Sequence, residues 1–120
     1  MNRSKALAAL SALAHGARLD LIRLLVPLGA NGLAAGEIAR ELGLSSSGLS
    51  FHLSALEQAG LLTSRRVARN VFYAVDPAGL GGTIGWLLND CCMEHPEVVA
   101  CSHLGRERAE ARLHPDEPQP

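Results

Sequence analysis

A very short junction between two helix-forming segments constrains this chain more than any other feature. The first segment, residues 34–42, ends at Gly43, and glycine tolerates the left-handed backbone at which helices end. The second segment, residues 46–59, follows Ser45, whose hydroxyl can accept a hydrogen bond from an otherwise unpaired backbone N–H and so begin a helix. The two helices are therefore joined by a tight turn of about three residues.

The patterns on both sides of this junction predict a mainly helical fold with one β-hairpin. Apolar residues recur at helical spacing before the junction, with Leu7, Leu10 and Leu13 on the first helix. Pro27 and the glycines after it predict a loop, and Asp76–Pro77 is a typical helix start. The predicted helices span residues 5–15, 16–26, 34–42, 46–59 and 77–92, and the predicted strands span 61–67 and 71–75.

The length of 120 residues suits one domain with a modest core. Hydrophobic residues make up 48% of the chain but aromatic residues only 3%, which favours helices packed through Leu, Ala, Ile and Val. We assign residues 1–92 to this domain and 93–120 to a C-terminal segment. Residues 105–120 mix charges with prolines and carry no apolar stripe, so we expect much of this tail to be disordered.

No apolar run approaches the roughly 20 residues that cross a bilayer, and the N-terminus lacks the features of a cleaved signal. We therefore expect a cytoplasmic protein with no membrane partner. Thiols stay reduced in that compartment, so an odd count of three cysteines is interpreted as ligands or reactive thiols rather than as a disulfide framework.

The charges are segregated along the chain, although the net charge is only −1. The predicted hairpin holds three arginines and no acid: Arg65, Arg66 and Arg69. Residues 76–120 hold eight acids against three arginines. A local basic patch can bind phosphates in a protein that is acidic as a whole.

A tight pair of helices followed by an arginine-bearing hairpin suits duplex DNA, with the second helix in the major groove and the hairpin on flanking phosphates. The outward face of that second helix would offer small hydroxyls to bases or phosphates, and Phe51 would contact a thymine methyl or pack at the groove edge. The predicted contact residues on this helix are Ser46, Ser47, Ser50, Phe51 and Ser54. From spacing alone, a solvated serine face and an ordinary exposed hairpin remain the alternative.

Three stretches of the chain together resemble the ArsR/SmtB metalloregulators: ALAHGARLDLIRLL, then EIARELGLSSSGLSFHLSALEQAGLL, then a basic hairpin ending VFYAVD. The resemblance covers residues 6–92. It implies a winged helix-turn-helix repressor that dimerises through its first and last helices, binds an imperfect palindrome and is released by an inducer. His52 lies within the motif and is interpreted as a structural or phosphate-contacting group, not a metal ligand.

The inducer site is predicted in the stretch NDCCMEHPEVVAC, which resembles the C-terminal three-thiol arsenite sites of some ArsR repressors. Its thiols are Cys91, Cys92 and Cys101. Arsenite prefers soft sulfur donors and takes three of them in a pyramid, and antimonite or a soft divalent metal has related chemistry. The adjacent pair points about 100° apart on a helix, so binding is expected to unwind or re-aim the helix end.

Other interpretations of the cysteines remain open at this stage. The thiols would be small buried hydrophobes in a purely structural role. A zinc or cadmium site would recruit His95 or His103, with Glu94 or Glu97 as further donors. A thiol-redox role is disfavoured because there is no C-x-x-C motif and acidic neighbours oppose a free thiolate. No arrangement of nucleophile, base or paired carboxylates indicates an enzyme.

Overall fold

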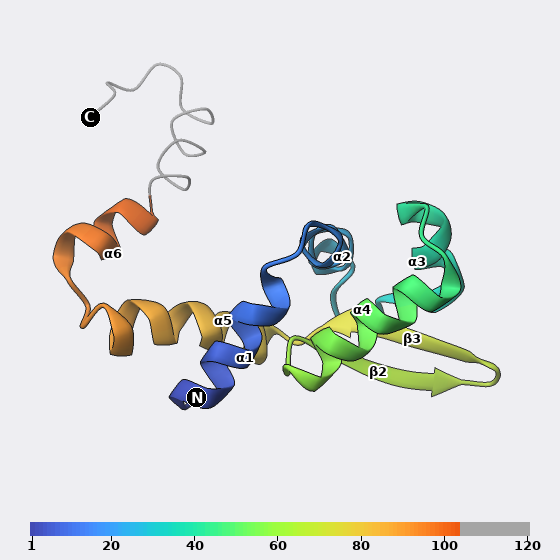
Figure 1. The fold of residues 1–120 in the computed structure, drawn as a ribbon, viewed down its shortest axis with the longest axis horizontal. Coiled ribbons are helices and arrows are strands. Elements are labelled where there is room, and N and C mark those ends of the chain that lie inside the picture. Colours follow the sequence, from blue (N-terminus) through green and yellow to red (C-terminus); the bar gives the residue numbers. More distant parts are fainter. Residues whose placement is uncertain (104–120) are drawn as a thin grey trace, which may run out of the picture. The chain divides into compact units, whose positions relative to one another are not determined.

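The computed structural model describes residues 1–103, which form helices and one small antiparallel sheet (Figure 1). The helical elements are α1 (Arg3–Leu13), α2 (Gly16–Leu25), η1 (Val26–Asn31), α3 (Ala35–Leu42), α4 (Ser46–Gln58), α5 (Pro77–Trp86), η2 (Leu87–Cys91) and α6 (Pro96–Ser102). The strands are β1 (Leu33–Ala34), β2 (Leu62–Val67) and β3 (Asn70–Val75). The mainly helical fold with a hairpin is the class that the sequence predicts. The predicted disorder of residues 105–120 lies outside the described residues.

The core is aliphatic and gathers α2, α3 and α4 against the start of the hairpin. Three leucines of α4 face inward at helical spacing, because 49, 53 and 56 fall on one side of the helix. Burying each such side chain stabilises the fold by about 1.5–3 kcal/mol. The largest fully buried aliphatic side chains are Leu21, Leu25, Ile38, Leu56 and Leu61.

The tight turn between α3 and α4 has the predicted chemistry. Gly43 adopts the left-handed conformation with φ 64°, and its N–H donates to the carbonyl of Ala39. The Ser45 hydroxyl accepts from the N–H of Gly48 at 3.2 Å and caps α4. The turn thus satisfies backbone groups at both helix ends, which fixes the angle at which α4 leaves α3.

The sheet has the order β1-β3-β2, with β3 in the centre. Its hairpin register pairs Arg65 with Phe72 and Val67 with Asn70, which leaves a two-residue turn at its tip. The short strand β1 was not predicted, because two residues give no alternating pattern. Gly32 precedes β1 with φ 61°, and a Cβ there would overlap the carbonyl oxygen of Tyr73, so only glycine allows this approach.

The residues of α1 that pack inward are alanines rather than the leucines at helical spacing. They are Ala6, Ala9 and Ala12. Small side chains let α1 lie close to its neighbours, and Leu7 is left 52% exposed. The leucines of α1 are thus only partly covered within one chain.

The chain divides into two compact units, Met1–Ile84 and a second unit that begins at Gly85. The α-helix that was expected to reach Cys92 ends at Trp86. Residues Leu87–Cys91 form a π-turn, in which the N–H of Cys92 donates to the carbonyl of Leu87 at 2.9 Å. Pro96 then begins α6, which was not predicted. Proline fits the first turn of a helix because no N–H is needed there.

Candidate nucleic-acid interface and thiol segment

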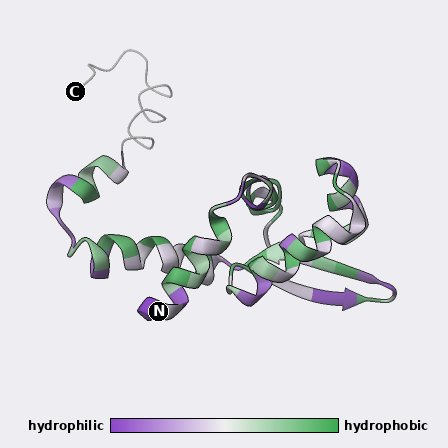
Figure 2. Cartoon of the chain, in the orientation of Figure 1, coloured by the Kyte–Doolittle hydropathy of each residue, from purple (hydrophilic) through white to green (hydrophobic). Residues whose placement is uncertain are grey.

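One side of α4 is exposed and uncharged. The five residues predicted there to contact DNA are all exposed to solvent, and Phe51 is 66% exposed. Residues on a helix advance by about 100° each, so positions 47, 51 and 54 lie opposite the buried leucines, and positions 46 and 50 lie on the flank next to them. Figure 2 shows α4 as an element of mixed hydropathy lying along the hairpin. This side of α4 offers hydroxyl groups and one aromatic ring.

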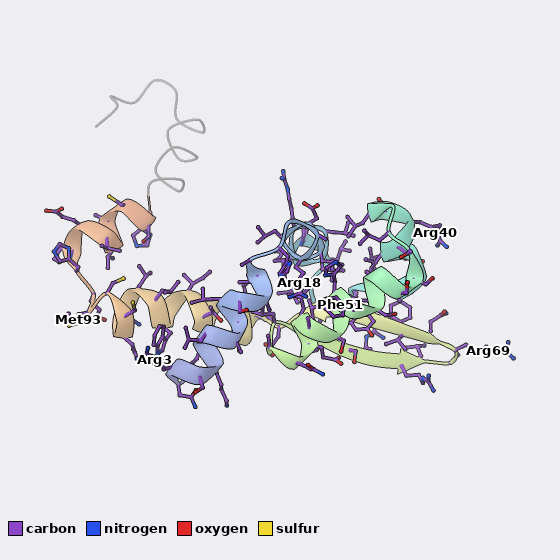
Figure 3. All side chains as sticks on the ribbon, in the orientation of Figure 1. Arg3, Arg18, Arg40, Phe51, Arg69 and Met93 are labelled. Atoms are coloured by element: carbon purple, nitrogen blue, oxygen red, sulfur yellow. The ribbon has the colours of Figure 1, made fainter. Side chains whose placement is uncertain are left out.

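The three arginines of the hairpin occupy different environments. The Arg65 guanidinium lies 4.8 Å from the centre of the Phe72 ring, and its Nη2 donates to the carbonyl of Asn31 at 2.9 Å. It therefore ties the hairpin to η1. Arg66 lies next along β2, and Arg69 stands at the tip of the hairpin (Figure 3). Figure 2 shows the hairpin becoming hydrophilic toward that tip.

A cluster that the sequence analysis missed lies between α2 and α4. Arg18 is only 6% exposed, and its Nε donates to Nδ1 of His52 at 3.1 Å. Its Nη1 donates to the carbonyl of Ala12 at the end of α1, at 3.3 Å. The guanidinium carbon also lies 5.5 Å from the centre of the Phe51 ring, and Figure 3 shows these two side chains close together. Arg18 thus contacts both α1 and α4.

A signal for this cluster was present in the sequence. Arg18 precedes Leu21, Ile22 and Leu25 at spacings of three, four and seven residues, so it lies on the buried stripe of α2. A charged residue on an apolar stripe indicates a specific partner. Its identity could not be deduced, because His52 is 34 residues away along the chain.

His52 is held in an environment that disfavours its charged form. Burial, the neighbouring charge of Arg18 and the nearby His15 together hold the pKa of His52 below its ordinary value. The rings of His15 and His52 lie 6.4 Å apart between centroids. His52 is therefore neutral at pH 7, with a lone pair on the nitrogen that accepts from Arg18.

The three predicted thiols are free, and the structure does not bring them together into a closed site. Cys91 and Cys101 are exposed and Cys92 is partly buried. Cys91 ends η2, whereas Cys101 lies on α6. In residues 1–103, no group of three His, Cys, Asp or Glu side chains is arranged to hold a metal ion.

In the thiol segment, residues 91–101, the surroundings of Cys92 favour its protonated form. Burial raises the pKa of the Cys92 thiol, and the adjacent Cys91 raises it further by its charge and by a hydrogen bond. Immediately after the pair, the backbone enters the left-handed region at Met93 and Glu94, with φ of 50° and 54°. His95 then caps α6, since its Nδ1 accepts from the N–H of Glu97 at 3.3 Å.

Known proteins share this arrangement. Residues 13–65 match the model of a helix-turn-helix domain. The chain is 35% identical over 88 residues to the HTH-type transcriptional regulator YgaV of Escherichia coli K12, covering 73% of this chain and 87% of that protein. The chain belongs to the helix-turn-helix transcriptional regulators.

Solved structures identify the fold of this regulator as ArsR-like and winged. The homodimeric winged helix-turn-helix DNA-binding domain of Mb0332 from Mycobacterium bovis is 25% identical, with a TM-score of 0.59 over 84% of this chain and 82% of that one. An ArsR-like transcriptional regulator from Rhodococcus sp. RHA1 is 24% identical and covers 92% of both chains with a TM-score of 0.61, which shows a shared fold. The winged fold class predicted from the sequence is confirmed.

No helix within residues 1–103 of the regulator has both the length and the apolar character needed to cross a membrane.

Proposed function

We propose that this regulator binds operator DNA as a homodimer and represses transcription of a metalloid-resistance operon until trivalent arsenic binds Cys91, Cys92 and Cys101. One observation carries the proposal for the inducer. All three cysteines of the chain are free thiols within a segment of eleven positions, 91–101, and two of them are exposed.

The DNA-binding part of the proposal is supported by two surfaces of the first unit. The hydroxyl-bearing side of α4 has the small groups that reach base edges and phosphates in a major groove. The hairpin adds Arg66 and Arg69, whose charges suit the phosphate backbone. Arg65 is held by Asn31 and Phe72, so we assign it a smaller share of the affinity for DNA than the sequence suggested.

The dimer is supported by apolar side chains that one chain leaves uncovered. Leu7 of α1 is 52% exposed and Ile84 of α5 is 53% exposed. Exposed aliphatic groups on α1 and α5 fit a dimer through those elements, and the Mb0332 domain is homodimeric. Two recognition helices would then meet two half-sites about one DNA turn apart.

Arsenite fits the thiol segment by charge and by stoichiometry. Arsenous acid carries three hydroxyl groups, and each thiol proton leaves with one of them as water while an As–S bond forms. Three thiols therefore give a neutral product and need no oxidant or counter-ion. Cys92, whose pKa is raised, is a poor free nucleophile at pH 7, but a thiophile displaces its proton on binding.

Binding requires the thiol segment to change shape. The π-turn that ends at Cys91 and the left-handed pair Met93–Glu94 separate the adjacent thiols from Cys101. Non-glycine residues pay about 1 kcal/mol or more in that region, so little is lost when this turn rearranges. We propose that closure of the three thiols around arsenic rearranges this turn and alters the dimer that presents the two α4 helices.

The two rival inducers find less support. A Cys3His zinc or cadmium site would recruit His95, but the Nδ1 of His95 caps α6, and only its other nitrogen is free to act as a ligand. A redox switch is opposed by the raised pKa of Cys92, since the thiolate is the form of cysteine that reacts with oxidants. Antimonite is thiophilic in the same way as arsenite and is expected to act at the same thiols.

The test is a fluorescence-anisotropy titration of the reduced, full-length regulator on a labelled duplex from its own promoter. Arsenite, antimonite, zinc, cadmium and hydrogen peroxide are added in separate titrations to the wild type, Cys92→Ser and Cys101→Ser. Ser102→Ala is the matched control, because it alters a neighbouring hydroxyl and leaves the thiols intact.

We expect low arsenite to release the DNA from the wild type and from Ser102→Ala, but not from either cysteine variant. Release by zinc or cadmium alone would move the site to a Cys/His set, and release by peroxide alone would make it a redox switch. If Cys92→Ser abolishes DNA binding, the thiols are structural. An absence of DNA binding under every condition would overturn the whole proposal.

A further inference from the structure

The guanidinium of Arg18 is a buried cation whose contacts in the described structure are all neutral. It donates to an imidazole nitrogen of His52 and to a peptide carbonyl of Ala12, and it stacks on the ring of Phe51. Burying a charge is costly unless a counter-ion accompanies it, because low-dielectric surroundings solvate ions poorly. The surroundings of Arg18 therefore lack the anion that usually accompanies a buried arginine.

The groups around Arg18 also favour an anion. The ring of His15 lies near that of His52, and the charges that act on His52 come from Arg18 and His15, with no carboxylate among them. His15 is the N-cap of α2, and its side chain makes no capping hydrogen bond. The first N–H groups of that helix thus add the positive end of its dipole.

The hydrogen bond from Arg18 decides which nitrogen of His52 carries the proton. A guanidinium N–H can only donate, so Nδ1 must present its lone pair. The single proton of the neutral ring is then on Nε2, which makes Nε2–H a donor. In residues 1–103, no buried side-chain nitrogen or oxygen lacks a partner, so Nε2 is not sealed inside the protein.

The position of His52 points to DNA as the source of the anion. His52 lies on α4 next to Phe51, which is 66% exposed on the side proposed to meet the major groove. His52 is partly exposed and lies beside that side, beyond Phe51, where a donor would meet the sugar–phosphate backbone rather than the bases. A phosphodiester oxygen accepts hydrogen bonds, and it carries the negative charge that is missing from the surroundings of Arg18.

We propose that Arg18 and His52 form a phosphate-binding pair, in which the buried guanidinium fixes His52 as an Nε2–H donor and that donor binds one backbone phosphate of the operator. Arg18 is a positioning residue in this pair, because it orients His52 and does not itself contact the phosphate. The inference rests on the proposed DNA binding of the regulator. It adds a contact to the DNA backbone from the middle of α4 to those proposed for the hairpin arginines.

Two substitutions of His52 separate its two nitrogens. In His52→Asn, the amide oxygen can take the place of Nδ1 and accept from Arg18, but nothing replaces the Nε2 donor. In His52→Gln, the longer amide can present a donor near Nε2, but it does not reproduce the Nδ1 acceptor. Both variants are compared with the wild type by thermal unfolding, and only those with native melting profiles enter the binding assay.

The binding assay measures Kd on a labelled promoter duplex over a range of NaCl concentrations. We expect His52→Asn to bind about tenfold more weakly. The slope of log Kd against log salt should change little, because His52 is a neutral donor and Arg18 keeps its charge in this variant. His52→Gln should recover part of the lost affinity. In the wild type, nitrogen NMR of the imidazole should show the Nε2–H form, and Arg18→Lys should weaken that preference.

A neutral-phosphate scan locates the contact. Methylphosphonate is substituted at one backbone position at a time, which removes a single charge from the DNA. We expect one position in each half-site to weaken the wild type and to have no further effect on His52→Asn, since the two changes remove the same contact.

The outcomes distinguish this inference from the proposed function. If the wild type binds no DNA, the proposed function fails. If the wild type binds and His52→Asn keeps its affinity, the phosphate pair is wrong while DNA binding stands. An Nδ1–H tautomer in the wild type would also overturn it.

Discussion

The guanidinium of Arg65 is held against Phe72 and Asn31, whereas that of Arg69 stands at the tip of the hairpin. Strand register causes this difference, because Arg65 is paired directly with Phe72 and the adjacent Arg66 has its side chain on the other face. The same residue type therefore supports the hairpin at one position and is available to a phosphate at another.

Arg69→Ala and Arg65→Ala are expected to fail in different ways. Loss of Arg69 removes one phosphate contact per subunit, so the salt slope of DNA binding should fall by about one per subunit while Tm stays unchanged. Loss of Arg65 removes a hydrogen bond and a ring contact, so the free energy of unfolding should fall by about 1 kcal/mol. Salt-dependent anisotropy and thermal unfolding measure the two effects, and equal salt slopes for both variants would contradict the assignment.

His52 links stability to pH. Its pKa is lowered in the folded state by burial, by Arg18 and by His15, so below pH 6.5 the unfolded chain binds more protons than the folded one. The stability that neutral His52 provides is therefore complete above about pH 6.5 and is lost as pH falls through the lowered pKa.

Urea unfolding at pH 7.5 and at several values below 6.5 tests this linkage. The wild type should lose more stability on acidification than His52→Asn, which keeps an acceptor for Arg18 but does not titrate in this range. The other histidines are common to both proteins, so the difference between them reports His52. Parallel pH profiles would show that His52 has the same pKa in both states.

Local sequence patterns predicted which residues of α4 are exposed, but not the contacts that α4 makes with α2. The exposed side of α4 follows from the 3.6-residue period, because the leucines at 49, 53 and 56 leave the serines and Phe51 on the other side. The contact between Arg18 and His52 depends on how α2 packs against α4, which no local pattern encodes. The thiols were found from residue type and spacing, but their separation depends on a π-turn and a left-handed pair that spacing cannot reveal.

At the scale of elements, the first turn of helix α5 packs closely against the turn that follows α4. A Cβ on Gly79 would overlap the carbonyl oxygen of Gly60, whereas a Cβ on Gly81 would meet nothing within 4 Å. Backbone cannot move aside as a flexible side chain can, so the first glycine is needed for packing and the second is not.

Two alanine substitutions, two residues apart on α5, test this contact. Gly79→Ala should lower the free energy of unfolding by about 1–3 kcal/mol, because the start of α5 must shift. Gly81→Ala should raise it by about 0.5–1 kcal/mol, because alanine loses less backbone freedom in a helix. Urea unfolding of both variants gives the comparison, and a stabilised Gly79→Ala would show that α5 begins elsewhere.

The elements that the sequence missed are those with too few residues to show a period. Strand β1 has two residues and is held by pairing of Leu33 with Tyr73. Helix α6 has seven residues, which is too short for a helical period to show in the sequence. The longer helices α2 and α4 and the hairpin were predicted within a few residues, since each carries both a period and a capping or turn residue.

At the scale of the whole molecule, repression by the proposed mechanism depends on two chains acting together. One recognition helix contacts too few bases to select an operator, and a dimer doubles the contacts and fixes the spacing of half-sites. The uncovered leucine of α1 is the observation within one chain that fits such an assembly.

Leu7→Glu should therefore give a monomer that binds promoter DNA far more weakly. A carboxylate placed in an apolar interface is desolvated without a partner, which costs several kcal/mol for the pair of subunits.

The matched control is Leu19→Glu, because Leu19 of α2 is 53% exposed and Leu7 is 52% exposed, so the two changes are equal in chemistry and in exposure. Analytical ultracentrifugation measures the mass of each protein, and anisotropy measures its affinity for DNA. A monomeric wild type that still binds with a two-half-site footprint would place dimer formation on the DNA. A dimeric Leu7→Glu would remove α1 from the interface.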